Sequence, residues 1–212
     1  MTTPQNLSWT ANSTASNLTY IEVIFQLSPS FFPDPDNLTA ANSIALPMLP
    51  SAGRKSGEYT SVEALANIED LITHYKTLLD LADRHRLTYS SYFYHFWLRL
   101  RLRSEDAEIE FAGYDTWCQM RTIFAWLEQA EDRLAMQEIS DGWELLIAQM
   151  GDRLHFKETG VDGSLRATNI AFSRDELLSR LPPLRTRVDQ VISPLVDEIG
   201  EDYWTDFRRD LA

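Results

Sequence analysis

Histidine side chains are the residues of this chain with the most evident capacity for acid–base chemistry. His95 lies in the aromatic run YFYHFW, and His155 follows the turn MGDRL. A histidine acts as a general base when a serine, cysteine or aspartate is held beside it. Neither residue has such a partner at a spacing that predicts a catalytic pair. We therefore expect both to be ordinary histidines on the surface of a sheet.

The sequence contains few residues whose spacing predicts a metal or cofactor site. His74 and His85 have no cysteine or acidic residue at metal-ligand spacing, so we expect them to be surface residues. The sequence has no glycine-rich phosphate loop, no paired cysteine motif, no His-Glu-x-x-His and no Gly-x-Ser-x-Gly. We predict no catalytic residues, no metal and no cofactor, and an enzyme whose site has no known motif remains the third alternative.

Cys118 is the single cysteine, so the chain cannot form an internal disulfide, which suits a reducing compartment. It lies among Trp117, Met120 and Ile123, which predicts a buried and unreactive thiol. The N-terminus lacks the basic and apolar blocks of a signal peptide, and no apolar run approaches the roughly 18 residues that span a bilayer. These features together predict a cytoplasmic protein.

The charge balance narrows the class of partner. The chain has 32 Asp and Glu against 19 Lys and Arg, a formal net charge of -13. Such a field repels nucleic acid and anionic membranes and attracts basic proteins. We therefore expect no nucleic-acid partner and no membrane partner, while homodimer formation remains open.

The stretch YFYHFWLRLRLRSEDAEIEF, residues 92–111, combines aromatic, basic and acidic residues. Its first half, as a strand, has three arginines on one face and three leucines on the other. A turn within SEDA would pair Arg101 with Glu110 on the solvent side and Leu100 with Phe111 in the core. Because glutamates then face the arginines, we do not expect this strand to bind nucleic acid.

The rest of the chain contains strand and helix patterns. Tyr20 to Leu27 is rich in β-branched and aromatic residues, which predicts a strand, and the proline-rich segment after it predicts irregular structure on the core. Apolar residues at helical spacing predict a helix from Ser61 to about Arg84 and another over residues 116–137. Residues 143–159 predict a hairpin closed at Gly151-Asp152, followed by a third strand over residues 165–172.

The C-terminal third is expected to be helical in two parts. SRDE, Ser173 to Glu176, is a capping box and begins a short helix to Leu181. Pro182-Pro183 is expected to break it, and a second helix then ends at Gly200. These elements predict an α+β fold, with an antiparallel sheet of five or six strands and helices on one side. We expect residues 1–60 to form an N-terminal arm, a strand and an irregular segment that pack on an α+β domain over residues 61–212, so that the chain is one folded unit overall.

Acidic residues interleaved with aromatic residues form the strongest candidate for an interaction surface. Carboxylates steer a basic partner, and aromatic burial slows its release. The alternative is that the aromatic rings fold back on the core, since tryptophan is usually buried. The candidate partner-binding residues are Asp197, Glu198, Glu201, Asp202, Tyr203, Trp204 and Asp206 near the C-terminus, with Glu128, Glu131 and Asp132 on the exposed side of the central helix.

Two segments of this third carry a resemblance to known proteins. DGWELLIAQMGDRLHFKE, followed by AFSRDELLSRLPPLRTRVDQVISPLVDEIGEDYW, resembles the ending of small bacterial immunity proteins. Such proteins neutralise a toxin by occluding its active site or holding it inactive. The resemblance implies an immunity or inhibitor protein whose partner is a cognate, basic toxin domain. A structural or adaptor protein of a secretion or phage assembly is the second hypothesis.

Overall fold

The chain folds into two compact units in the computed structural model, which describes residues 7–34, 36–50, 57–111, 115–132, 135–140, 143–160 and 168–205. The first unit comprises Met1–Glu22, Leu100–Asp115 and Gln119–Leu184. The second comprises Val23–Arg99, Thr116–Cys118 and Arg185–Ala212. Both units therefore draw on residues before and after residue 60.

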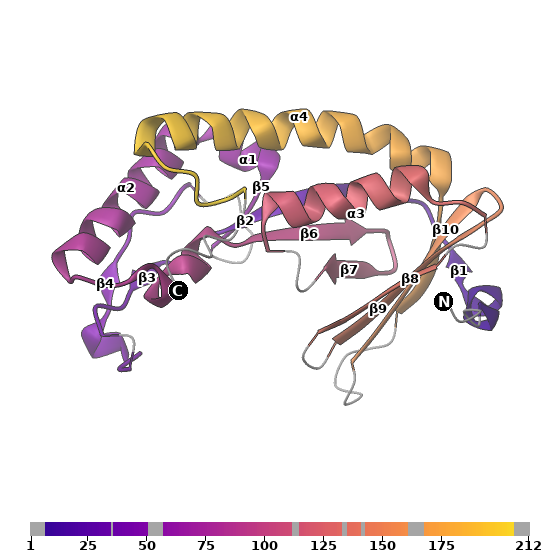
Figure 1. The fold of residues 1–212 in the computed structure, drawn as a ribbon, viewed down its shortest axis with the longest axis horizontal. Helices are drawn as coiled ribbons and strands as arrows, with labels where there is room; N and C mark the ends of the chain where they lie inside the picture. The colour runs from indigo at the N-terminus through magenta and orange to yellow at the C-terminus, as the bar shows by residue number, and fades with distance from the viewer. Residues whose placement is uncertain are drawn as a thin grey trace. The chain divides into compact units, whose positions relative to one another are not determined.

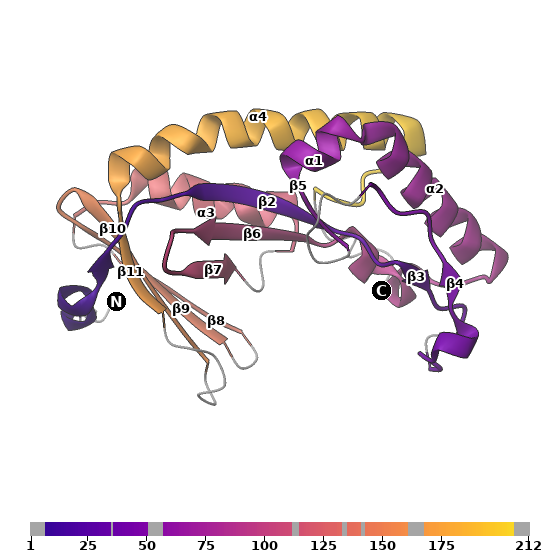
Figure 2. The ribbon, with the colours of Figure 1, turned by 180° about the vertical axis from the view of Figure 1, so that it is seen from behind.

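The fold is α+β, as the sequence predicts. A five-stranded sheet in the first unit has the order β1-β11-β10-β9-β8. Figures 1 and 2 show its strands side by side, and only the pair of β1 and β11 is parallel. Its strands are β1 (Thr14–Ala15), β8 (Ala135–Ser140), β9 (Trp143–Met150), β10 (Arg153–Gly160) and β11 (Thr168–Ser173).

The strands do not all join one sheet. A second, four-stranded antiparallel sheet has the order β5-β2-β6-β7, and a small third sheet pairs β3 with β4. Their strands are β2 (Tyr20–Gln26), β3 (Ser30–Phe31), β4 (Ile44–Ala45), β5 (Glu58–Thr60), β6 (Leu98–Arg103) and β7 (Glu108–Phe111). The 3-10 helices η1 (Ser8–Asn12) and η2 (Ala40–Asn42) lie in the connecting segments.

The β6–β7 hairpin has the register that the charge pattern predicts. Arg101 pairs with Glu110, and Leu100 pairs with Phe111. The side chains of Leu100 and Phe111 are fully buried, so the leucine face is the core face. Arg101 is more covered than expected on a solvent side, because only 12% of its side chain is exposed.

The aromatic residues before β6 do not extend that strand. Residues 89–96 form two 3-10 helices, η3 (Tyr89–Ser91) and η4 (Phe93–Phe96), and the strand prediction is wrong there. A strand would alternate His95 and Phe96 between opposite faces. The 3-10 turn instead buries both, with His95 1% and Phe96 2% exposed, and Phe96 stacks on Tyr75 at 5.2 Å between ring centroids.

The helix predicted from Ser61 is divided into α1 (Ser61–Ala66) and α2 (Ile68–Arg84). Thr60, not Ser61, caps it: the Thr60 hydroxyl accepts from the Glu63 backbone N–H, and the Glu63 carboxylate accepts from the Thr60 N–H. Ser61 is fully buried, and its hydroxyl oxygen accepts a hydrogen bond from Nε of Arg187 at 2.6 Å.

The central helix is shorter than expected. Helix α3 (Trp117–Gln129) ends well before residue 137, and residues 135–140 form β8 on the edge of the five-stranded sheet. Backbone pairing with β9, from Ala135 opposite Ala148 to Ser140 opposite Trp143, outweighs the helical spacing of this segment.

The C-terminal helix is longer than expected. Helix α4 (Arg174–Ile199) runs through Pro182 and Pro183 without ending. Its buried residues continue at helical spacing on both sides of the prolines, and this uninterrupted apolar stripe offsets the hydrogen bonds that proline removes. The stripe comprises Leu177, Leu181, Leu184, Val188, Val191 and Leu195. Gly200 ends the helix as predicted, with a positive φ of 81°.

Every helix among the described residues is too short or too polar to cross a membrane.

Candidate functional site

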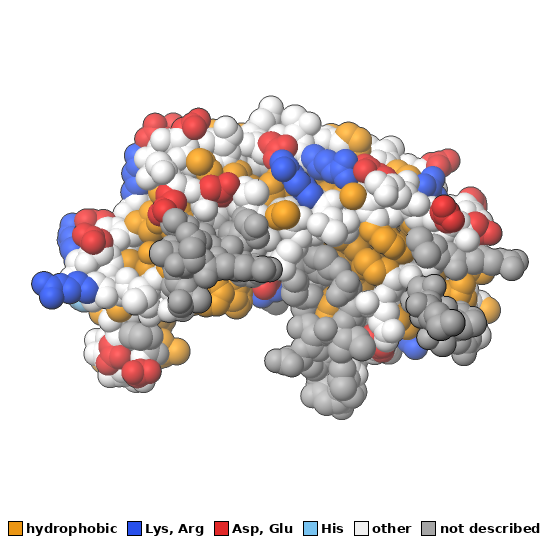
Figure 3. All heavy atoms as spheres, viewed as in Figure 1, with side chains coloured by type: hydrophobic (Ala, Val, Ile, Leu, Met, Phe, Trp, Pro, Cys, Tyr) orange, Lys and Arg blue, Asp and Glu red, His pale blue; other side chains and the backbone are white. Residues whose placement is uncertain are grey.

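The acidic end of α4, defined as Asp197, Glu198, Glu201 and Asp202, lies within the second unit. Asp197, Glu198 and Asp202 are exposed, and Glu201 is half-buried. Figure 3 shows acidic side chains, in red, over the C-terminal end of α4. Lys76 of α2 forms an ion pair with Glu198 at 2.7 Å, and its hydrogen bond and charge lower the pKa of that carboxyl group.

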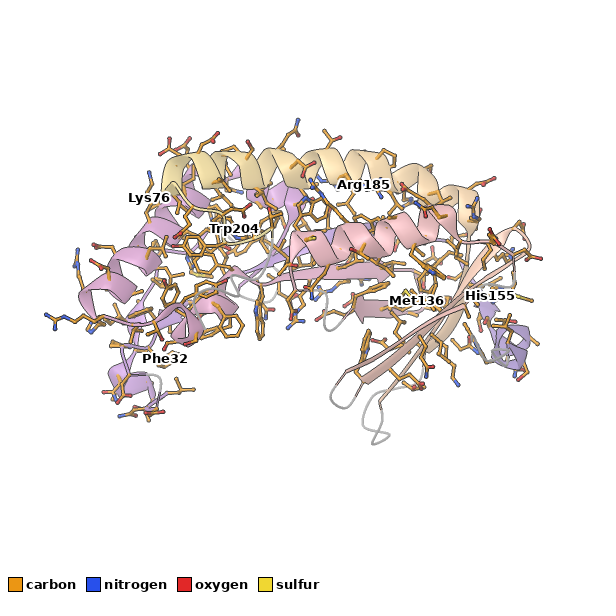
Figure 4. All side chains as sticks on the ribbon, viewed as in Figure 1. Phe32, Lys76, Met136, His155, Arg185 and Trp204 are labelled. Atoms are coloured by element: carbon orange, nitrogen blue, oxygen red, sulfur yellow. The ribbon has the colours of Figure 1, made fainter. Side chains whose placement is uncertain are left out.

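Tyr203 and Trp204 belong to the core. Tyr203 is 8% exposed and Trp204 is fully buried. Phe96 stacks on Tyr203 at 4.4 Å between ring centroids, and Tyr75 meets Trp204 edge-on at 4.9 Å. Figure 4 shows Trp204 beneath α4, directed inward. The aromatic rings of Tyr203 and Trp204 therefore fold back on the core, as the alternative interpretation of the sequence expected, and anchor this segment.

Backbone hydrogen bonds fix the same segment from two sides. The Asp202 carboxylate accepts from the backbone N–H groups of Trp204, at 3.0 Å, and Thr205, at 2.9 Å. The first turn of α3 donates to the segment as well, from Trp117 N–H to the Trp204 carbonyl at 2.9 Å and from Cys118 N–H to the Thr205 carbonyl at 2.8 Å. The acidic end of α4 is therefore held on a rigid support. Asp206 lies outside the described residues.

The other predicted acidic residues lie in the first unit. Glu128, Glu131 and Asp132 are all exposed, but only Glu128 is on α3, because the helix ends at Gln129. The Asp132 carboxylate accepts from the backbone N–H of Gly151 at 2.7 Å, which ties it to the β9–β10 turn. Asp132 thus has a structural role in addition to its charge.

Two arginines of β6, Arg101 and Arg103, lie close to carboxylates of β7. Arg101 contacts Glu110 at 2.6 Å and Glu108 at 3.3 Å, and Arg103 lies 3.9 Å from Glu108. The charges of Arg101 and Arg103 are therefore met by carboxylates within the hairpin.

The histidines depart most from expectation. His74, His95 and His155 are all buried, and only His85 is exposed as predicted. The Nδ1 atom of His74 lies 2.7 Å from the Pro47 carbonyl, so it carries the proton and donates. Burial lowers the pKa of His74 and His155, and burial followed by the charge of His74 lowers the pKa of His95 to about 4.

Cys118 is exposed, and the prediction that it is buried is wrong. The apolar spacing around it belongs to Trp117 and Met120, which are both buried on the inner side of α3. Cys118 is the residue between them in the first turn, so its side chain points the other way.

A pocket of about 380 Å³ lies at the end of β2, within the second unit. Its walls come from two segments, the end of β2 with residues 27–29 and the η4–β6 junction. The lining residues are Gln26, Leu27, Ser28, Pro29, Tyr94, His95, Trp97 and Arg99. Sequence reasoning placed His95 on a sheet surface and therefore missed this pocket. Its sequence signal was an aromatic run that ends beside an arginine.

No family model, no curated protein and no solved structure matches the chain. Within the described ranges, no group of three or more His, Cys, Asp or Glu side chains is placed to hold a metal ion.

Proposed function

We propose that this protein is an immunity or inhibitor protein that binds a basic bacterial toxin domain and neutralises it by occlusion. The observation that carries the proposal is the acidic end of α4 on its buried aromatic support. Asp197 and Asp202 are exposed, while Tyr203 and Trp204 hold the chain that presents them. Groups that are already fixed lose little conformational freedom on binding, which favours affinity.

Long-range charge supports the same proposal. A net charge of -13 raises the encounter rate with a basic protein, and exposed carboxylates direct that encounter. The burial of Tyr203 and Trp204 changes one element of the mechanism. Because both rings are buried, apolar contact with the partner would come from other side chains. Tyr203 and Trp204 contribute by holding the acidic residues in place.

The proposal is tested by isolating the partner and measuring its neutralisation. The full chain is purified from its native host, and any stoichiometric partner is identified and then produced alone. We expect a basic partner that stops bacterial growth, with growth restored by co-expression of this chain. An acidic partner, or a partner whose toxicity this chain leaves unchanged, would overturn the proposal.

A variant then locates the binding surface. Asn or Gln at four positions removes four negative charges and keeps the side-chain shapes. The substitutions are Asp197→Asn, Glu198→Gln, Glu201→Gln and Asp202→Asn. We expect this variant to protect cells less well than a control that loses four charges elsewhere. The control substitutions are Asp34→Asn, Asp36→Asn, Glu105→Gln and Asp106→Asn, all at exposed positions. Equal protection by both variants would remove the acidic end of α4 from the interface.

A further inference from the structure

A polar pocket of about 240 Å³ lies in the first unit, where three segments of the chain meet. The segments are β1 with the two residues after it, the β6–β7 turn and the start of β10, which Figures 1 and 2 show close to one another. The lining residues are Ala15, Ser16, Asn17, Glu105, Asp106 and Arg153. The pocket is smaller than sites for drug-sized molecules, so it suits a ligand of few atoms.

Backbone hydrogen bonds hold the walls of this pocket in place. The Ser16 N–H donates to the Ala171 carbonyl of β11 at 3.0 Å, which fixes the chain after β1 on the five-stranded sheet. The Thr19 N–H donates to the carbonyl of Arg103, the last residue of β6, at 2.8 Å. The same chain is therefore tied to both of the other walls. Side chains on such a fixed backbone lose little conformational freedom when a ligand binds, which favours affinity.

The charged lining residues carry both signs but do not pair with one another. Arg153 is half-buried, while Glu105 and Asp106 are exposed, so all three are open to a ligand from solvent. Across the described part of the chain, none of these three side chains takes part in an ion pair. A guanidinium group binds a carboxylate through two parallel hydrogen bonds, and carboxylates accept from ammonium groups. The pocket therefore suits a ligand that carries both signs of charge.

The balance of these charges favours a ligand with one more positive than negative group. Two carboxylates and one guanidinium give the lining a net charge of -1, and the whole chain carries -13. An amino acid with a basic side chain has two ammonium groups and one carboxylate, so it matches the lining group by group. Asp106 also lines a second pocket, of about 480 Å³, whose other walls include Asn12, Thr14 and Asn169. A polar side chain that passes Asp106 therefore has polar surroundings.

We propose that this pocket binds a free α-amino acid with a basic side chain. Arg153 pairs with the α-carboxylate of the ligand, and Glu105 and Asp106 accept hydrogen bonds from its two ammonium groups. The site lies in the first unit and the acidic end of α4 lies in the second. This activity therefore goes beyond the binding of a protein partner and does not depend on it.

The test uses the full chain labelled with ¹⁵N and L-lysine as the probe. Two analogues each lack one charged group: cadaverine has no carboxylate, and norleucine has no side-chain ammonium. We expect millimolar lysine to shift the backbone N–H resonances of Asn17 and Asp106. Each analogue should bind at least about tenfold more weakly, because it loses a charge-assisted hydrogen bond. Absence of these shifts at millimolar lysine would overturn the proposal, and so would equal affinity for lysine and either analogue.

Substitutions then assign each charge of the ligand to its partner in the pocket. Arg153→Gln should weaken binding of lysine at least about tenfold and leave cadaverine no weaker, because cadaverine has no carboxylate for the guanidinium. The double variant Glu105→Gln, Asp106→Asn should weaken binding of both. Arg121→Gln removes an exposed charge on α3, outside the lining residues, and should change neither. Full affinity for lysine in Arg153→Gln or in the double variant would overturn the proposal.

Discussion

The β6–β7 hairpin and the acidic end of α4 both contain several charged residues within a few positions, but they use the charge differently. In the hairpin, Arg101 contacts Glu108 and Glu110, so each sign of charge is met by the other. At the end of α4, Lys76 pairs with Glu198, while Asp197 and Asp202 lie exposed beside it. The hairpin charges are therefore met within the hairpin, and we propose that the exposed carboxylates of Asp197 and Asp202 direct an encounter with another molecule.

The support beneath each region differs as well. Arg101 and Glu110 lie on a strand pair whose other face buries Leu100 and Phe111. The acidic end of α4 is held instead by the buried rings of Tyr203 and Trp204 and by backbone hydrogen bonds from the first turn of α3. Removing that support should affect the α4 region most.

The largest effect is expected for Trp204→Ala. Trp204 is fully buried and contacts both Tyr75 and Phe96. Loss of a large buried aromatic side chain costs about 3–5 kcal/mol of unfolding free energy. Urea denaturation measures this loss. Trp126→Ala, at a half-buried position on α3, is the matched control and should cost less than half as much. Equal losses for the two variants would contradict the role of Trp204 as the anchor.

Acid should destabilise the protein through His95. Burial, with the charge of His74 second, holds the pKa of His95 at about 4, below the ordinary 6.5. A group with a lowered folded pKa contributes stability above pH 6.5 and loses it as the pH falls toward 4. The full contribution is about 3 kcal/mol.

The His95→Asn variant isolates this contribution. The urea midpoint of wild type and variant is measured from pH 8 to pH 4. His74 and Tyr94 also face His95, and both remain in the variant. We expect the variant to lose at least half of the pH dependence between 6.5 and 4. If the urea midpoint of the variant changed with pH as steeply as that of the wild type, His95 would not be the group that titrates.

A smaller effect is expected in the hairpin. Glu110→Gln should cost about 1–2 kcal/mol, because Arg101 is mostly covered and loses a charged partner at 2.6 Å. Arg103→Gln should cost less than about 0.5 kcal/mol, because Arg103 is 57% exposed and lies 3.9 Å from Glu108. Chemical denaturation compares the two. An equal cost would mean that burial does not decide the strength of these pairs.

Hairpin registers and helix ends could be predicted directly from the sequence. The register of β6 and β7, the β9–β10 hairpin, the end of α2 at Arg84 and the stop at Gly200 all follow from local patterns. Each of these features depends on residues that are neighbours in the chain or in one hairpin. Local propensity and side-chain alternation are enough to specify them.

Tertiary contacts decide the features that the sequence did not predict. Residues 93–96 form a 3-10 helix because Phe96 packs on Tyr75 and Tyr203, which are distant in sequence. Residues 135–140 join a sheet through pairing with β9, and α4 passes two prolines because its stripe stays buried. The pocket at the end of β2 is formed by the η4–β6 junction and the end of β2 together, so the aromatic run before Arg99 indicated only one of its two walls.

The salt dependence of partner association tests the central claim most directly. Association and dissociation rates are measured from low to high salt for the wild type, for the four-fold variant at the acidic end of α4 and for the matched four-charge control. We predict that salt lowers the association rate more than it raises the dissociation rate, since exposed charges are screened beyond about 8 Å. The α4 variant should associate more slowly than the control and respond less to salt. Association rates that are equal in the two variants at every salt concentration would contradict the claim that this surface binds the partner.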